Sequence, residues 1–429
     1  MRIAFIVYQG NPSSGGQGVF TYYLSRELTR LGHEVHVIAG RPYPEVDDAV
    51  HFHKLKTYRI WDFMADIDEY RFRTNPLLFF HPVNMYEMAS TRLSLGSLLF
   101  TFSMRAYYKL HELAQEQPFD LVHDNQTLSY GILLMKAKGL PVVASIHHPL
   151  TIDRRNRLLQ VKGIHRKALT FLWFPWVMQD FTARRLDRII TCSDNSAATI
   201  QKELALPPGK LQVIHYGADT DVFKPLDDVE KLSNSVLFVG DSEDRNKGAL
   251  YLLEALHTLR HRLPFRMTFV DHRPPPHLKL VQRLMKQYRL YNNIEILPRA
   301  TTEDLVRLYN RTQVVVSPSL YEGFGLPAVE AMACGVPVIA TRAGALSEII
   351  EDGVTGLLVP PADPGALSEA LRLLLSDPEL CLRMGQAGRE RVLKNFTWRR
   401  TAERMAQAYE EVRREAALSH AYRQAGGPA

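Results

Sequence analysis

Residues 317–341, SPSLYEGFGLPAVEAMACGVPVIAT, constrain the fold of this chain more than any other segment. Pro327 favours the start of a helix there, because proline lacks the N–H group that has no partner in a first helical turn. Gly335 follows the apolar run, at a position where helices commonly end. Residues 336–341 are short and apolar, as expected of a buried strand. We therefore expect a loop, a helix and a strand in this order.

Two carboxylates eight positions apart accompany this helix start: Glu322 lies in the loop and Glu330 in the first helical turns. The N–H groups at such an end have no partner in the helix, and they attract anions. They belong to Gly323, Phe324, Gly325 and Leu326. Carboxylates beside them suit hydrogen bonds to the hydroxyls of a sugar or a ribose. The alternative is that Glu330 only stabilises the helix N-terminus and that Glu322 is solvated.

The whole local pattern, including YEGFGLP and CGVPVIAT, resembles the E-x7-E motif of glycosyltransferase family 4, also called group 1. The resemblance implies an α/β GT-B fold, in which two doubly wound Rossmann-like domains have a cleft between them. It also implies transfer of a sugar, with retention of configuration, from a nucleotide-diphosphate sugar to an acceptor hydroxyl. In this family pattern Glu322 holds the sugar as a catalytic residue and Glu330 accepts hydrogen bonds from the ribose.

The length and composition fit this class of enzyme. A chain of 429 residues is too long for one ordinary core. Three widely separated cysteines exclude a disulfide framework and fit a reducing cytoplasm. No apolar run is long enough for a signal peptide or a spanning helix. The net charge of +6 suits phosphorylated ligands or an anionic membrane, and no nucleic-acid-binding module is visible.

Strands alternate with helices in two similar halves, which predicts two parallel sheets. We expect a first domain over 1–215, a linker over 216–234 and a nucleotide-sugar-binding domain over 235–395. The resemblance implies that a helix over 396–417 crosses back to the first domain, and 418–429 reads as a disordered tail. The expected strands are 2–8, 34–39, 120–123, 141–146, 188–192, 236–239, 266–270, 294–297, 314–317 and 336–341.

Two loops are candidates for holding the donor diphosphate. Gly15 and Gly16 follow the first strand and resemble the glycine loop of the family, although a tight structural turn explains them equally well. The loop after residues 236–239 carries Lys247, which matches a phosphate-binding lysine of the family. Asp241 stands where the family usually has arginine, and Arg245 is close enough to supply that charge. The alternative is a solvated, charged loop.

Polar residues at the ends of first-domain strands are candidates for sugar and acceptor contacts. His147 aligns with a family histidine beside the transferred sugar, and we expect it to act in catalysis. A packing histidine is the alternative. His148, Asp124 and Asn125 are further candidates on the acceptor side. In the second domain we place the base pocket near Arg299.

Residues 154–176 combine basic and aromatic side chains, which suits an anionic membrane surface. The alternative is that the aromatic residues belong to buried helices. The membrane interpretation predicts a cytoplasmic enzyme that is peripheral on the inner face of the membrane. Its acceptor would then be a lipid or a lipid-linked glycan, rather than a free glycan or a small molecule.

No HExxH motif is present, and no D-x-D motif marks a bound divalent ion, so we expect no metal ion and no cofactor. Two other functions are compatible with the same motifs. One is a sugar phosphorylase of the same fold, which would use inorganic phosphate. The other is a non-catalytic relative that binds a nucleotide or a membrane, for which the departure at Asp241 is the only support.

Overall fold

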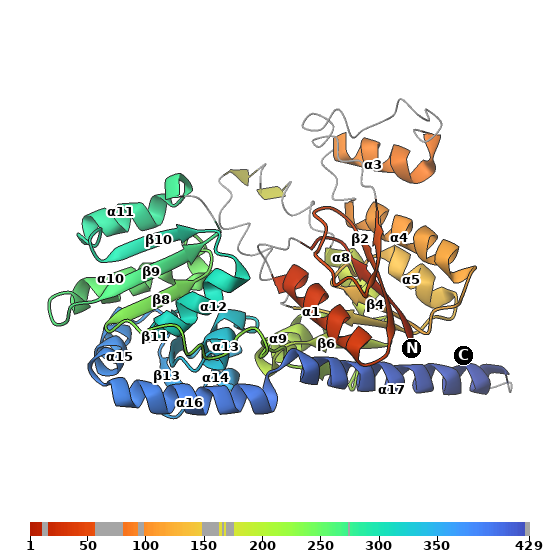
Figure 1. Ribbon diagram of the computed structural model, residues 1–429. Helices are drawn as coiled ribbons and strands as arrows, with labels where there is room; N and C mark the ends of the chain where they lie inside the picture. Colours follow the sequence, from red (N-terminus) through yellow and green to blue (C-terminus); the bar gives the residue numbers. More distant parts are fainter. Residues whose placement is uncertain are drawn as a thin grey trace. The chain divides into compact units, whose positions relative to one another are not determined.

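The computed structural model describes residues 1–10, 16–55, 80–92, 98–147, 163–164, 167–168, 176–272 and 275–424. Its chain forms two compact units (Figure 1). The first unit contains Met1–Thr191, Ala197–Ile214 and Ala402–Ala429, and the second contains Cys192–Ser196 and His215–Thr401. Each unit is built around one parallel sheet, as the sequence predicts.

The described residues of the first unit form a seven-stranded sheet of order β3-β2-β1-β4-β5-β6-β7. Its strands are β1 (Arg2–Val7), β2 (Glu34–Ala39), β3 (His51–Lys54), β4 (Leu121–Asn125), β5 (Val142–Ser145), β6 (Arg188–Thr191) and β7 (Leu211–Val213). The sequence analysis missed both edge strands, β3 and β7. Edge strands are buried on fewer sides, so neither carries the apolar run by which the inner strands are recognised.

Helices cover both faces of this sheet (Figure 1). The face that presents Ala4 and Ile6 packs against Phe102, Leu110 and Ile132 from two helices. On the opposite face the Phe5 ring lies 6.1 Å from that of Phe20. The helices of this unit are α1 (Gly16–Arg30), α3 (Pro82–Arg92), α4 (Leu98–Ala114), α5 (Tyr130–Ala137), α8 (Trp176–Ala183) and most of α9 (Asp194–Leu204).

The second unit has a six-stranded sheet of order β10-β9-β8-β11-β12-β13. Its strands are β8 (Ser235–Val239), β9 (Arg266–Asp271), β10 (Ile294–Pro298), β11 (Val314–Ser317), β12 (Val338–Thr341) and β13 (Gly356–Val359). The sequence analysis missed β13, another edge strand. Because all neighbouring strands run parallel, the loops that follow them all lie at one edge of the sheet.

Helices pack on both faces of this second sheet as well. Val236 and Phe238 share a core with Leu252 and Leu371 from the helices of one face, and α13 packs against β11 and β12. The helical segments are η2 (Arg245–Lys247), α10 (Ala249–Leu259), η3 (Pro275–His277), α11 (Lys279–Gln287), α12 (Thr302–Arg311), α13 (Leu326–Ala333), α14 (Leu346–Ile349), α15 (Pro364–Ser376) and α16 (Pro378–Asn395). In the described part of the chain, no helix has the length and apolarity needed to span a bilayer.

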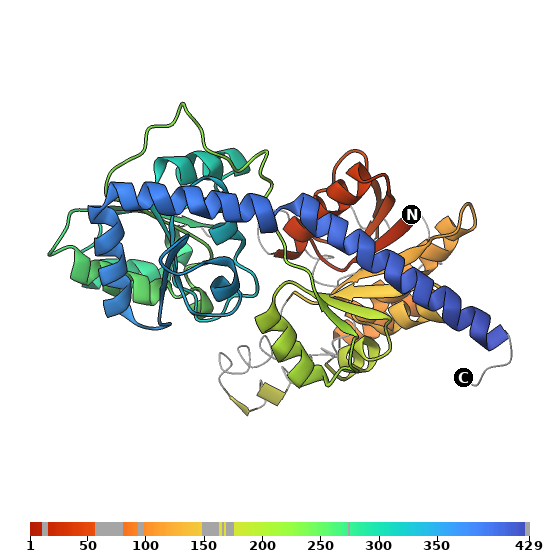
Figure 2. The same ribbon diagram turned by 90° about the horizontal axis from the view of Figure 1, so that it is seen from below.

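The last helix, α17 (Trp398–Gln424), contributes to both units (Figure 2). Trp398 stacks on Tyr216 within the second unit, with the ring centroids 5.6 Å apart. Residues 402–424 belong to the first unit, where the Tyr409 hydroxyl bonds to His123 Nδ1. The helix runs to Gln424, so residues 418–424, which the sequence analysis assigns to a disordered tail, are helical.

The contact between Tyr409 and His123 predicts a measurable loss of stability in Tyr409→Phe. His123 is fully buried, and its Nε2 already lies 2.8 Å from Ser145 Oγ. Removing the Tyr409 hydroxyl leaves Nδ1 without its partner, which costs about 1–3 kcal/mol. Urea unfolding should show this loss. The control is Tyr422→Phe, because Tyr422 lies on the same helix but is 60% exposed. Equal stability of the two variants would contradict the anchoring role.

Candidate active site

The loops that follow β8 and β11 meet at the point where the order of the second sheet reverses. The chain proceeds from β8 outward to β9 and β10, and then returns to place β11 on the other side of β8. Ligands of open α/β sheets bind beside the carboxyl ends of the strands at such a point. The two loops are joined here by a hydrogen bond of 2.7 Å from the Leu320 N–H to the Asn246 carbonyl.

A salt bridge between Lys247 and Glu322 links the side chains of these loops. Lys247 Nζ lies 2.9 Å from Glu322 Oε2 and 3.1 Å from Oε1. Burial lowers the pKa of Lys247, but the charges of Glu322, Asp244 and Asp241 outweigh this effect and raise it overall. The Ser319 hydroxyl also donates to Glu322 Oε2 over 3.0 Å. The carboxylate is therefore fixed between one cation and one hydroxyl.

Two glycines with positive φ allow close backbone approaches here: Gly248 brings the loop after β8 close to the loop after β11, and Gly344 brings the loop after β12 close to Glu322. A Cβ on Gly248, which has φ +69°, would lie 1.9 Å from the Pro318 carbonyl oxygen. A Cβ on Gly344, with φ +57°, would lie 2.0 Å from the carbonyl oxygen of Glu322. Both positions require glycine, because the backbone conformation disfavours L side chains and the space is already filled.

Helix α13 begins at Leu326, four residues after Glu322 and one residue before the predicted start at Pro327, and its N-terminus has no side-chain cap. Gly325 precedes it with φ +102°, and Pro327 lies in its first turn. The Gly323 carbonyl accepts a hydrogen bond of 2.9 Å from Ser193 Oγ, and Phe324 is buried. Within the described residues, the N–H groups of residues 323–326 have no hydrogen-bond acceptor. This combination of N–H groups, Lys247 and Glu322 suits an anion that carries hydroxyl groups.

Glu330 lies one helical turn further along α13, and a tyrosine that the sequence analysis missed holds it in place. The Tyr309 hydroxyl donates to Glu330 Oε2 over 3.0 Å. Burial raises the pKa of Glu330 to about 7, from an ordinary value of 4.5, although this hydrogen bond acts in the opposite direction. The motif around Glu330 does not include Tyr309, because Tyr309 lies on α12 and only the folded structure brings it next to Glu330.

Arg245 and Arg299, the two remaining donor-binding candidates of this unit, lie at the same edge of the sheet, as does Asp241. Asp241 accepts N–H groups from Glu243 and Asp244 and so shapes the loop after β8. Arg245 is exposed in η2, and Arg299 is exposed directly after β10. Contacts of Arg245 with phosphate and of Arg299 with the base stay predictions.

The first unit gathers polar residues at the corresponding point of its own sheet, where β1 and β4 are neighbours. His147 follows β5, and its Nε2 contacts Asn125 Oδ1 at the end of β4. The His147 N–H donates to Gln126 Oε1 over 2.8 Å, and the ring packs edge-on against Phe20 of α1. Asn125 also donates to Thr21 Oγ1 over 3.0 Å. The structure thus brings His147, Asn125 and the start of α1, which begins at Gly16, together.

Asp124 is placed differently from the other acceptor-side candidates, because its side chain is fully buried. Its two carboxylate oxygens accept the backbone N–H groups of Thr127 and Leu128 over 3.2 and 2.7 Å. Burial raises its pKa to about 6, and these hydrogen bonds partly offset the rise. Asp124 therefore holds the loop that follows Asn125, which is a positioning role. Gly15, His148 and most of 154–176 lie outside the described residues.

Two doubly wound α/β units, with an E-x7-E loop at the sheet reversal of the second, define a glycosyltransferase of the GT-B class. Family models bear this out: residues 14–222 match "Glycosyltransferase Family 4" and residues 225–391 match "Glycosyl transferases group 1". The chain belongs to glycosyltransferase family 4, and it is a glycosyltransferase.

Individual relatives agree with this assignment. The chain is 36% identical to an "MMP alpha-(1->4)-mannosyltransferase" of Mycolicibacterium hassiacum, over 96% of this chain and 98% of that protein. It is 27% identical to a "D-inositol 3-phosphate glycosyltransferase" of Corynebacterium efficiens, over 96% of each chain. The sucrose-phosphate synthase of Thermosynechococcus elongatus has the same fold, with a TM-score of 0.72, 23% identity, and coverage of 96% of this chain and 98% of that one.

The raised pKa of Glu330 predicts a pH-dependent effect of Glu330→Gln on stability. The folded protein holds this proton more tightly than the unfolded chain, so the contribution to stability is complete below pH 4.5 and is lost as the pH rises through 7. Glutamine does not ionise, so the variant does not lose this stability as the pH rises. Relative to wild type, the variant should therefore gain about 2 kcal/mol between pH 5 and pH 8 in urea unfolding.

The matched control is Glu230→Gln, because Glu230 is an exposed carboxylate in the same unit. Its stability should follow that of wild type at both pH values. A constant difference between Glu330→Gln and wild type across this range would show that Glu330 titrates normally.

Proposed function

We propose that this glycosyltransferase moves a hexosyl group, and specifically a mannosyl group, from a nucleotide-diphosphate sugar to a glycan hydroxyl with retention of configuration. The observation that carries the proposal is the Lys247–Glu322 salt bridge beside the uncapped N-terminus of α13. The choice of mannose rests on the relative that is 36% identical and is called an alpha-(1->4)-mannosyltransferase.

The diphosphate is the part of the donor that the second unit suits best. Its negative charge matches Lys247 and the free N–H groups of residues 323–326, because charge-assisted hydrogen bonds to phosphate oxygens are strong. The exposed Arg245 adds a second cation to the same loop. Gly16, at the start of α1 in the first unit, is the corresponding backbone contact that the family pattern implies.

Glu322 is the group that we propose to hold the sugar. A lone carboxylate beside a diphosphate would repel it, and Lys247 cancels this repulsion because it contacts both carboxylate oxygens. When the diphosphate binds, Lys247 can interact with phosphate while Glu322 accepts hydrogen bonds from sugar hydroxyls. Ser319 keeps the carboxylate in place during this exchange. On the first unit, Asn125 fixes the orientation of His147, the residue that the family pattern places beside the transferred sugar.

We propose that Glu330 binds the ribose by accepting hydrogen bonds from its hydroxyls. Its carboxylate lies on α13 beyond the phosphate-binding N–H groups, and Tyr309 occupies one of its oxygens. The ionised form is the better acceptor for two ribose hydroxyls, so donor binding should lower the raised pKa of Glu330. Arg299, which follows β10 at the same sheet edge, is the candidate for contact with the base.

The reaction breaks the bond between the anomeric carbon and the diphosphate oxygen and forms a bond to the acceptor oxygen. For retention, the acceptor attacks from the face that the diphosphate leaves. The hydroxyl proton then passes to the departing phosphate oxygen. Lys247 and the N–H groups of residues 323–326 stabilise the negative charge that develops there, so we propose that the reaction needs no metal ion.

We propose a sugar hydroxyl as the acceptor, because the name of the mannosyltransferase relative specifies an alpha-(1->4) linkage. A lipid or lipid-linked glycan acceptor, and attachment to a membrane surface, depend on residues 154–176. Most of these residues lie outside the described part of the chain. Mannan oligosaccharides should therefore be assayed first, with GDP-mannose, UDP-glucose and ADP-glucose as donors.

Glu322→Gln should lower kcat for sugar transfer by about 100-fold or more, because it removes a charge that acts in the transition state. The assay measures nucleoside diphosphate release, and proton NMR of the product reports the anomeric configuration. Glu254→Gln is the control, because Glu254 is exposed on α10 of the same unit.

The fold of Glu322→Gln should be checked by circular dichroism, since the change also removes the partner of Lys247. Unchanged turnover in a folded Glu322→Gln variant would refute the proposed role. A product of inverted configuration would refute the retaining reaction but not the donor site.

A further inference from the structure

A second polar cluster lies in the first unit, outside all the residues assigned to sugar transfer. It consists of Glu34 and His36 on β2, together with His51 and His53 on β3. In the strand register His36 pairs with His51 and Ile38 with His53. Side chains two positions apart on a strand share a face, so all four side chains point to the same side of the sheet.

This cluster is at the amino-terminal end of the strands, whereas the candidate active-site residues follow the carboxyl ends. Glu34 and His51 are the first residues of β2 and β3. Asn125 and His147 lie at the opposite end of the same sheet. The cluster therefore serves no step of the proposed reaction.

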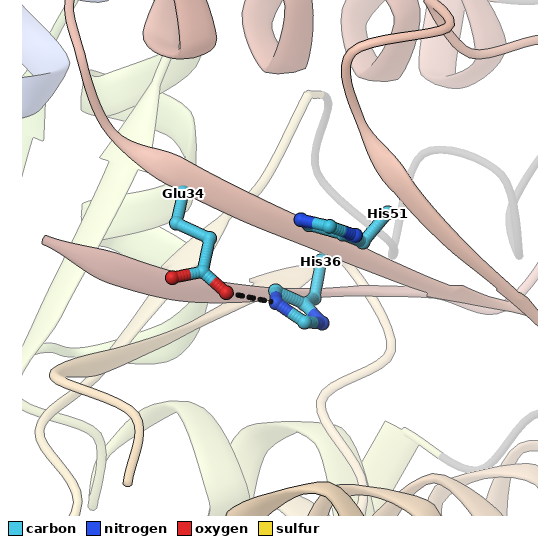
Figure 3. Close-up of side chains that lie close together, drawn as sticks. All are labelled: Glu34, His36 and His51. Atoms are coloured by element: carbon cyan, nitrogen blue, oxygen red, sulfur yellow. Dashed lines mark hydrogen bonds and ion pairs between the residues drawn. The ribbon is translucent and has the colours of Figure 1, made fainter. Parts of the chain in front are cut away.

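The side chains are close enough to share one cation (Figure 3). One ligand atom from each of Glu34, His36 and His51 lies within 4.8 Å of the other two. His36 Nε2 is 2.8 Å from Glu34 Oε1, and the His36 and His51 ring centroids are 4.5 Å apart. Zinc–nitrogen and zinc–oxygen bonds of about 2.0–2.2 Å require ligand atoms a little over 3 Å apart, which small side-chain rotations provide.

His53 fixes the orientation of His36. Its Nε2 lies 3.0 Å from His36 Nδ1, and the two rings are stacked with an interplanar angle of 8°. If Nδ1 of His36 donates its hydrogen to His53, the lone pair of Nε2 points towards Glu34. A metal-ligating histidine usually donates its other N–H to a hydrogen-bond acceptor, and His53 Nε2 occupies that position here.

The neighbouring Arg2 limits the affinity of this cluster for a cation. Arg2 Nε lies 3.0 Å from Glu34 Oε1 and places a positive charge beside the carboxylate. The guanidinium also donates to the Gln117 carbonyl, so a cation has to share Glu34 with Arg2. Dissociation constants in the micromolar range are therefore expected rather than those of a closed structural zinc site.

We propose that Glu34, His36 and His51 bind one divalent transition-metal ion of the zinc class, with His53 as the positioning residue for His36. Two imidazoles and one carboxylate suit zinc and its neighbours in preference to magnesium or calcium. His51 is exposed, so solvent can complete the coordination. The ion would tie the edge strand β3 to β2, and this adds stability because the unfolded chain lacks the site.

Another group of possible metal ligands lies elsewhere in the chain and consists of Asp194, His215 and Glu348. It is the weaker candidate, because the Glu348 carboxylate already accepts N–H groups from Asp194 and Asn195 over 2.9 Å. It supplies an internal comparison, because zinc bound there would depend on Glu348 and not on His51.

The test is calorimetric titration of the chelator-treated full chain with ZnCl2 at pH 7.5. Wild type should bind one ion with micromolar affinity, and its melting temperature should rise with zinc. His51→Gln and Glu34→Gln should each weaken this binding at least tenfold. His277→Gln, at an exposed histidine of the second unit, and Glu348→Gln should bind as wild type does.

Because His51 is exposed, His51→Gln should fold normally, with sugar transfer at the wild-type rate. Cobalt binding to wild type should give visible absorption bands that this variant lacks. Zinc binding that is unchanged in His51→Gln, or that is lost instead in Glu348→Gln, would overturn the proposal. So would the absence of a one-to-one binding event in wild type.

Discussion

The salt bridge between Lys247 and Glu322 joins the two loops on which the candidate donor site depends. It forms because β8 and β11 are neighbouring parallel strands. After β8 the chain continues to β9 on one side of this pair, and after β11 it continues to β12 on the other side. Gly248 then lets these two loop backbones approach, and Gly344 lets the loop after β12 approach Glu322, because a side chain at either position would overlap a carbonyl oxygen. The order of the strands, the two glycines and the ion pair thus form one structural arrangement.

The same arrangement underlies the sugar transfer that we propose for this chain. A carboxylate that holds a sugar has to lie near a diphosphate, and two negative groups at that distance repel each other. In the proposed function Lys247 removes this conflict, because it contacts Glu322, and the hydrogen bond from Ser319 holds Glu322 while Lys247 also interacts with phosphate. Glu330 lies further along α13, where Tyr309 and burial, rather than a cation, determine its state.

The sequence predicted features that depend on residues close together in the chain. The helix after Glu322 and the inner strands follow from local patterns, and the class of enzyme follows from the resemblance of one local motif to family 4. The structure and the relatives confirm these predictions. Partners that only the fold brings together gave no such signal: Tyr309 comes from another helix, and His36 meets His51 through strand register. The edge strand β3 went unrecognised for the related reason that it has no apolar run.

The positive charge of Lys247 should offset the repulsion between Glu322 and a bound diphosphate. Nucleotide binding to a variant without this charge tests the proposed donor site most directly. Calorimetry with a chelator present should compare wild type and Lys247→Met for a nucleoside diphosphate and the matching monophosphate. The account predicts that the variant binds the diphosphate at least tenfold more weakly, with a smaller loss for the monophosphate. Equal diphosphate affinity in the two proteins would contradict it.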